Sequence, residues 1–294
     1  MRWYSRRPIP LAEGSNIYMT WYFAPIRLKN AAQDAAAKLA KYAVQKNIKK
    51  SPQEAFKASW ESLLSNPLYR FLVRISQDPT RDETRLKGRT FKLLSREIPE
   101  FFRSIRIVVS ADLKAALDSE KPIVIVQIHE GHDFLSRVME GHNREFTRIV
   151  GKPKRYAQRM RLLGIDSSRA HLIGKGVLSL AHLRKSVRSN HVICCIVDYG
   201  DGTGRRDYIS PAIFVFANRT QIPVFFVKAR VDDAGVGELI SSGPHNNIDP
   251  LMCASKFLDF LSSVGDSRVE MTIKRQLNIS TGKAKRRNFK RPVR

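Results

Sequence analysis

Residues 123–133, with the sequence IVIVQIHEGHD, are the most informative stretch for the fold. A run of β-branched residues, typical of a buried strand, is followed at once by histidines and acids. Two more compact apolar runs occupy residues 192–197 and 222–227. Continuous apolar runs, as opposed to strict alternation, are typical of strands buried on both faces of a parallel sheet. We therefore predict that residues 123–128, 192–197 and 222–227 are central strands.

Shorter strands and helices are predicted between these central strands. Strands that alternate with helices imply crossover connections, and hence an α/β fold with a mostly parallel sheet flanked by helices. A hairpin is expected where residues 237–241 pair with residues 225–231. The remaining expected elements are strands at 105–109, 146–150 and 171–173, and helices at 111–119, 153–163, 177–187 and 250–264.

The first hundred residues have a mainly helical pattern. Residues 31–47 are strong helix formers, and Ser51-Pro52-Gln53-Glu54 has the composition of a capping box at a helix start. Further helices are expected at 68–75 and 86–102. The pattern predicts three sections: a helical N-terminal section with a basic and aromatic arm (1–104), an α/β core (105–270) and a basic C-terminal tail (271–294).

The chain is strongly basic, with 52 Lys and Arg against 27 Asp and Glu among 294 residues, a net charge of +25. Its hydrophobic content of 43% excludes a disordered chain. The last twelve residues carry seven basic side chains and no acidic one, and removing them leaves a charge of +18. Such a charge favours a polyanionic partner: nucleic acid, an anionic membrane surface or an acidic protein.

The setting expected for the chain is the cytoplasm. No apolar stretch approaches the length needed to cross a bilayer, and the three cysteines do not form a disulfide pattern. Residues 1–30 combine Trp and Tyr with Arg, which suits either contact with a membrane interface or an arm packed on the protein.

The segment that follows the first central strand contains His129, His132 and two acidic residues. In open α/β sheets, ligand sites form outside the carboxyl ends of the strands. Three interpretations apply. In the first, the segment is a polar turn with acids at a helix N-terminus. In the second, His129, His132 and Asp133 bind a metal, although their spacing is not that of H-E-x-x-H. In the third, which we favour, His129 and Asp133 form a catalytic pair.

This region resembles the lysophospholipid acyltransferase-like superfamily, and within it the late, Kdo-dependent acyltransferases of lipid A biosynthesis. The similarity spans roughly residues 105–240 and rests on the order of short motifs. The segments that carry it are 110–132, 155–164, 170–175, 183–200 and 220–227.

The resemblance implies an acyltransferase that moves a fatty acyl group, not an aminoacyl group, from a thioester donor to a hydroxyl or amine. The donor would be acyl carrier protein or CoA, and the acceptor a lipid or glycolipid. His129 would be the general base, Asp133 would orient it, and Arg159 would bind substrate or the oxyanion. One departure is that the family's acid comes one position later, where this chain has Phe134.

A second expected substrate-binding segment follows the strand at residues 192–197. It contains Asp198, Gly200, Arg205 and Arg206. The resemblance implies that this loop holds the acceptor or a substrate phosphate, for which paired arginines supply forked donors. No cofactor and no metal is expected.

The expected location is the cytoplasmic face of the inner (plasma) membrane, where basic residues hold the protein peripherally. One alternative is an acyltransferase-like protein that binds lipid without catalysis. A nucleic-acid-binding protein is less favoured, because the sequence has no helix-turn-helix, zinc-finger or RRM signature.

Overall fold

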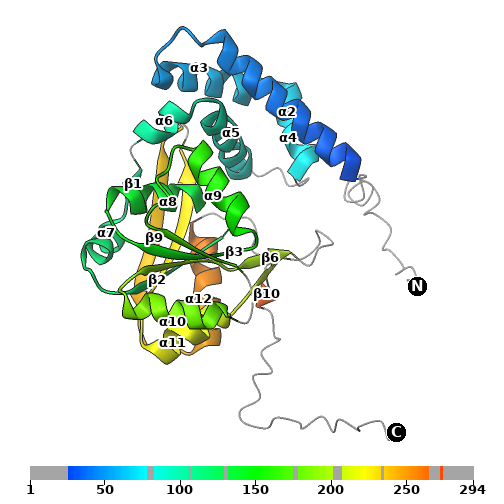
Figure 1. Cartoon of the computed structure of the whole chain (residues 1–294). Helices are drawn as coiled ribbons and strands as arrows, with labels where there is room; N and C mark the ends of the chain where they lie inside the picture. Colours follow the sequence, from blue (N-terminus) through cyan, green and yellow to red (C-terminus); the bar gives the residue numbers. More distant parts are fainter. Residues whose placement is uncertain are drawn as a thin grey trace, which may run out of the picture.

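A seven-stranded, mostly parallel β-sheet forms the centre of the molecule (Figure 1). The computed structural model describes residues 26–77, 83–105, 107–128, 132–174, 178–200, 207–232, 235–264 and 272–273. The α/β class and the mostly parallel sheet predicted from the sequence are confirmed.

The strand β2 lies at the middle of the sheet, parallel to both of its neighbours β5 and β8. Only β9 runs antiparallel to its partner β8, as the predicted hairpin requires, and β1 pairs in parallel with β9. In order across the sheet the strands are β1 (Val108–Val109), β9 (Gly237–His245), β8 (Val224–Val231), β2 (Ile123–Gln127), β5 (Val192–Ile196), β3 (Phe146–Val150) and β4 (Ala170–Gly174).

Helices cover both faces of this sheet, so alternate residues of β2 belong to different cores. Ile123 and Ile125 pack in one core, whereas Val124 and Val126 pack in the other. The first core is covered by α7 (Ala111–Asp118), α8 (His132–Gly141) and α9 (Pro153–Leu162), and the second by α10 (Ser179–Arg188), α11 (Ala212–Thr220) and α12 (Pro250–Ser263).

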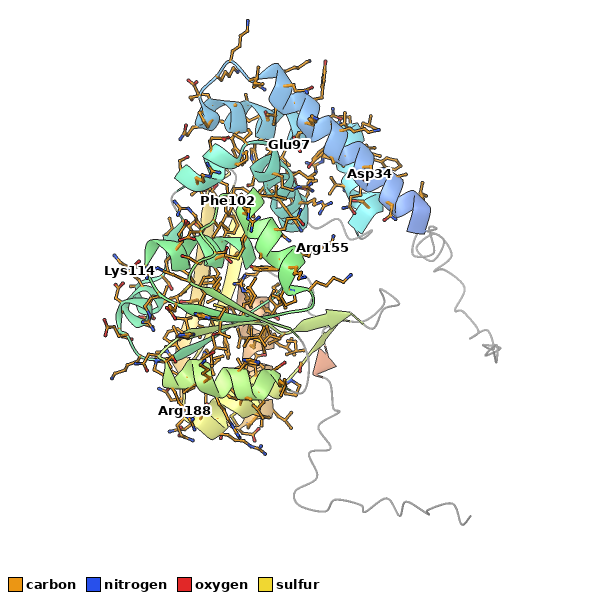
Figure 2. The ribbon with its side chains drawn as sticks, viewed as in Figure 1. Asp34, Glu97, Phe102, Lys114, Arg155 and Arg188 are labelled. Atoms are coloured by element: carbon orange, nitrogen blue, oxygen red, sulfur yellow. The ribbon has the colours of Figure 1, made fainter. Side chains whose placement is uncertain are left out.

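The N-terminal helices extend the first core. Phe91 and Phe102 pack against Phe134 of α8, and Phe102 lies where these helices meet the sheet (Figure 2). The predicted capping box is present, since the Ser51 and Glu54 side chains each accept a hydrogen bond from the other's backbone N–H. These helices are α2 (Ile26–Lys46), α3 (Pro52–Ser65), α4 (Pro67–Gln77), α5 (Glu83–Glu97) and α6 (Pro99–Ser104).

One prediction on helices is wrong, and one helix was not predicted. Residues 86–102 do not form one helix: α5 ends at Glu97, Ile98 is not helical, with φ −129° and ψ 72°, and α6 begins at Pro99. Proline lacks a backbone N–H and disfavours helical geometry in the residue before it, so the chain breaks there. The helix α11, rich in Phe, Val and Ile, was not anticipated from the sequence.

A small second sheet follows β5. Its strands β6 (Asp198–Gly200) and β7 (Asp207–Ile209) are antiparallel, and β10 (Thr272–Ile273) runs parallel to β7. All three cysteines are free, in agreement with the absence of a disulfide pattern in the sequence, and all three are buried. Among the described helices, none is both long and apolar enough to cross a membrane. The aromatic arm up to residue 25 and the tail beyond residue 273 lie outside the described residues.

Candidate functional site

The carboxyl ends of β2 and β5 meet at one edge of the sheet. The two strands are parallel neighbours, and the Val197 N–H donates a hydrogen bond to the Gln127 carbonyl at 3.0 Å. The backbone of β6 therefore begins beside the point where the chain leaves β2. The predicted substrate-binding residues Asp198 and Gly200 lie on β6, at this carboxyl edge.

Several predicted site residues lie outside the part of the chain that the structure describes. His129 falls in the gap at residues 129–131, and Arg205 and Arg206 fall in the gap at residues 201–206. The described part of α8 begins at His132, so the predicted contact between His129 and Asp133 stays a prediction.

Asp133 occupies the first turn of α8, where the helix dipole favours a carboxylate. Its Oδ2 forms an ion pair with Nη2 of Arg159 from α9. The Asp133 side chain is only 14% exposed and that of Arg159 30% exposed. The structure therefore brings together two of the predicted site residues, Asp133 and Arg159, as an anion and its counter-ion.

A fully buried guanidinium, that of Arg148 on β3, lies behind this ion pair. Its Nη1 donates to the Ser136 hydroxyl at 2.9 Å and to the Tyr156 hydroxyl. Burial alone would lower the pKa of Arg148, but Tyr156, Cys194 and Asp133 oppose that effect, and the pKa lies above its ordinary value. Asp133 thus pairs directly with Arg159 and offsets part of the charge of the buried Arg148.

Lys92 on α5 interacts electrostatically with Asp133, with Arg159 and with two neighbouring arginines of its own helix. We call these four cations, Arg89, Lys92, Arg96 and Arg159, the cation cluster. The first three are spaced i, i+3 and i+7 on α5 and therefore share one face of the helix. Burial, and then repulsion from Arg159, lowers the pKa of the half-buried Lys92 to about 8, against the attraction of Asp133. Burial also lowers the pKa of Arg89.

This arrangement favours an anionic ligand. Four cationic side chains and one carboxylate leave the carboxyl edge strongly positive, and three of the cations are half-buried. Guanidinium and ammonium groups of this kind bind phosphate and carboxylate groups through charge-assisted hydrogen bonds. Binding of such a group would relieve the repulsion that lowers the pKa of Lys92.

Phe134 stands where the acyltransferase family that the sequence resembles has its acidic residue. In the structure its side chain belongs to the hydrophobic core. It is 4% exposed, its ring centroid lies 4.7 Å from that of Phe91, and a Cβ on Gly237 would overlap its ring. An ionised side chain could not be accommodated there without loss of packing. Among the described residues of this segment, Asp133 is therefore the carboxylate that pairs with the cation cluster.

A hollow of about 270 Å³ lies near the other end of α8. It does not adjoin Asp133, so it is not the apolar slot that an acyl chain would need beside the predicted catalytic pair. Its lining residues are Ile105, Ile107, Val109, Arg137, Val138, Gly141 and His142.

Sequence reasoning missed the contribution of α5. The i, i+3, i+7 spacing of Arg89, Lys92 and Arg96 was visible, but on a helical pattern it indicates only a polar face. Arg148, in a run of apolar strand residues, was also missed.

A scan against protein-family models and a search of curated proteins found no match to the chain.

Proposed function

We propose that the protein is a membrane-peripheral acyltransferase that moves a fatty acyl group from a thioester to a hydroxyl or amine of a lipid or glycolipid. One observation carries the proposal: the half-buried Asp133 carboxylate lies in the first turn of α8, the helix after the central parallel strand β2, where it pairs with Arg159 and attracts Lys92 of the cation cluster. Open α/β sheets bind their ligands at this edge.

In the proposed reaction, His129 removes the proton from the acceptor hydroxyl as the oxygen attacks the thioester carbonyl. The carbonyl oxygen becomes an oxyanion, which cationic groups at the site stabilise. When the tetrahedral intermediate collapses, the C–S bond breaks and the protonated His129 returns its proton to the departing thiolate. Asp133 stabilises the imidazolium, since a carboxylate accepts hydrogen bonds from more than one donor at once.

The cation cluster has a distinct role in this proposal. CoA and the prosthetic group of acyl carrier protein are both phosphorylated, so Lys92 and Arg159 are suited to hold a donor phosphate. Because β6 begins at the same edge, the loop that contains Arg205 and Arg206 is proposed to bind the acceptor.

The membrane contact is proposed to combine charge with exposed apolar side chains. On α4, Leu68 and Phe71 are 56% and 51% exposed and lie one turn apart, on the same helix as Arg74. Basic residues also lie on other helices around the molecule, including Lys114 and Arg188 (Figure 2). An anionic leaflet would attract such residues by about 1 kcal/mol each, which favours the cytoplasmic face of the inner membrane.

Thioester consumption by wild type and by His129→Ala tests the proposed reaction. We expect loss of His129 to slow acyl transfer by about 10²- to 10⁴-fold, the usual contribution of a general base. His182→Ala is the matched control, because His182 is exposed on α10, and it should keep the wild-type rate. Equal rates for His129→Ala and wild type would refute the role of His129.

Binding measurements separate the alternatives. Vesicle sedimentation should show binding to anionic vesicles that weakens in a Phe71→Ser variant truncated after Gly282. Turnover of no thioester, together with intact vesicle binding, would favour the non-catalytic lipid-binding protein. Turnover of no thioester with tight, salt-sensitive binding to DNA or RNA would favour the nucleic-acid-binding class.

A further inference from the structure

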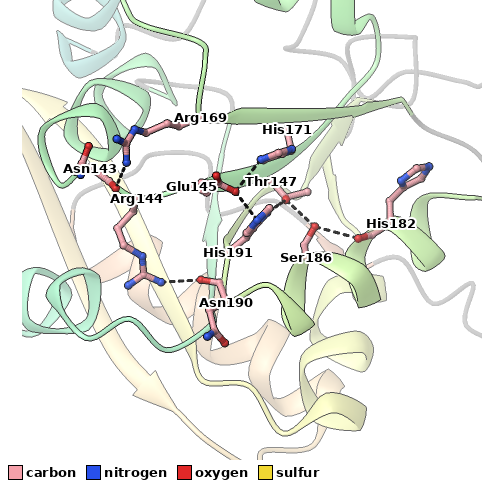
Figure 3. A network of polar contacts seen from close by, with 10 residues as sticks. All are labelled: Asn143, Arg144, Glu145, Thr147, Arg169, His171, His182, Ser186, Asn190 and His191. Atoms are coloured by element: carbon pink, nitrogen blue, oxygen red, sulfur yellow. Dashed lines mark hydrogen bonds and ion pairs between the residues drawn. The ribbon is translucent and has the colours of Figure 1, made fainter.

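A cluster of metal-binding side chains lies at the amino edge of the sheet, opposite the candidate site (Figure 3). Glu145 directly precedes β3, His171 lies in β4, and His191 directly precedes β5. Because β3, β4 and β5 are parallel neighbours, their amino ends meet at one edge and bring the three residues together. None of the three has a role in the proposed acyl transfer.

The ligand atoms of this cluster already converge. His191 Nε2 lies 2.7 Å and His171 Nε2 3.1 Å from the same carboxylate oxygen, Glu145 Oε2. One ligand atom from each residue lies within 4.8 Å of those of the other two. The two imidazole rings stack with centroids 4.5 Å apart.

We propose that Glu145, His171 and His191 bind one divalent transition-metal ion, with Zn²⁺ the best match. Two imidazoles and one carboxylate form an established zinc ligand set, with metal–ligand bonds of about 2.0–2.2 Å. A tetrahedral ion with such bonds separates its ligand atoms by about 3.4 Å. The two separations from Glu145 Oε2, 2.7 and 3.1 Å, are a few tenths of an ångström shorter than that value, so small side-chain rotations would complete the site.

The exposed fractions of the three side chains suit such a rearrangement. The Glu145 and His171 side chains are 53% and 49% exposed and are able to rotate, whereas the His191 side chain is only 11% exposed. His191 would thus be the fixed ligand onto which the other two close. Solvent at the exposed side would supply the fourth ligand, as water does in open zinc sites.

An outer layer of hydrogen bonds orients His191. Thr147 Oγ1 lies 3.1 Å from His191 Nδ1 and 2.7 Å from Ser186 Oγ, and Ser186 Oγ donates to the His182 carbonyl at 3.0 Å (Figure 3). In the present contact Nε2–H donates to Glu145 Oε2. In the metal-bound form, Nδ1–H would donate to Thr147 and the ion would take the place of the Nε2 proton. Second partners of this kind fix the ring and tautomer of metal-binding histidines.

The neighbouring Arg144 does not compete for the site, because its guanidinium is occupied. Arg144 Nη2 donates to the Asn190 carbonyl at 2.9 Å and to the Lys121 carbonyl at 3.0 Å. Nη1 donates to the carbonyls of Leu117 and Ser119 at 3.0 and 3.2 Å. These bonds hold the loop before His191 in place, and they direct the positive charge at backbone oxygens.

The ion would have a structural role. β4 is the last strand of the sheet and pairs only with β3 among the described strands. A metal held by residues of β4 and by residues that precede β3 and β5 would fasten this edge strand to its neighbours. Binding to the folded state alone would then raise the melting temperature.

Titration of the untagged, full-length protein with Co²⁺ and then Zn²⁺ tests the proposal. We expect one equivalent of Co²⁺ to give the visible absorption of a tetrahedral site and Zn²⁺ to displace it. His171→Ala should weaken binding by more than about 100-fold, and Thr147→Val, which changes the outer layer, by about 10- to 100-fold. Glu145→Gln, a second change of a proposed ligand, should also weaken binding. Circular dichroism establishes that each variant is folded.

Two histidine controls make the test specific. His182→Ala removes an exposed imidazole from the adjacent α10 and should leave the affinity unchanged. His129→Ala should also leave it unchanged, which separates this site from the proposed acyl-transfer residues. Binding retained in both His171→Ala and Glu145→Gln, or absence of stoichiometric binding by wild type, would overturn the proposal.

Discussion

Replacement of Lys92 by Met is expected to stabilise the protein and weaken donor binding. Lys92 is half-buried on α5 near Arg159, and this environment lowers its pKa from 10.5 to about 8. At pH 7 the folded protein therefore holds an ammonium that is disfavoured relative to the unfolded chain. Methionine keeps much of the side-chain volume and removes the charge.

The magnitude follows from the difference between the two pKa values. It corresponds to about 3 kcal/mol, at about 1.36 kcal/mol for each pKa unit. Water reaches the half-buried ammonium and screens the repulsion, so we expect Lys92→Met to raise the free energy of unfolding at pH 7 by about 1 to 2 kcal/mol.

The pH dependence gives the prediction its specificity. The penalty on wild type is fully present below pH 8 and declines as the pH rises from about 8 to 10.5, because the unfolded chain binds the proton more tightly in that range. The advantage of Lys92→Met should therefore shrink across this window in urea denaturation measured at several pH values.

Lys114→Met is the matched control for Lys92→Met. Lys114 is exposed on α7, so its replacement should change the free energy of unfolding by less than about 0.5 kcal/mol at any pH in the series. Destabilisation by Lys92→Met at pH 7, or a gain independent of pH, would refute the description of the cation cluster.

Three further predictions concern the surroundings of the site. Asp133→Asn removes the partner of Arg159 and should lower the free energy of unfolding by about 1–3 kcal/mol, against about 0.3–1 kcal/mol for the exposed helix-start acid in Asp112→Asn; equal losses in urea denaturation would contradict this. Phe134→Glu should prevent folding, as judged by circular dichroism, whereas Phe134→Leu should fold; a folded Phe134→Glu would show that the position is not core. Burial raises the pKa of the Cys194 thiol, so thiol reagents should modify it only after unfolding, and rapid labelling of the native protein would contradict its burial.

The α/β class could be predicted because the central strands carry their own signal. Residues 123–127 and 192–196 are buried on both faces, and such strands are continuously apolar in sequence. The helix α11 could not be separated from a strand in this way, because a buried helix and a buried strand have similar composition. Pro99 in the sequence indicates the break at Ile98, but the helical pattern of the surrounding residues led to the prediction of one continuous helix.

The candidate site could be predicted only where it follows directly from a strand end. Asp133 was found because it comes just after β2, but its partner Arg159 was named through the resemblance and not through their contact. Lys92 belongs to a helix that is distant in sequence, and only tertiary packing brings it to Asp133. The cluster of Glu145 and His171 likewise depends on strand order, which the sequence alone did not specify.

The central claim is that a thioester donor binds at the cation cluster, and the reactivity of Lys92 tests it most directly. At pH 8 a large fraction of Lys92 should be unprotonated and should react with an amine reagent, which mass spectrometry quantifies residue by residue. We predict that long-chain acyl-CoA or acyl carrier protein slows this reaction several-fold while exposed Lys114 reacts unchanged. Equal modification of Lys92 with and without either donor would contradict the claim.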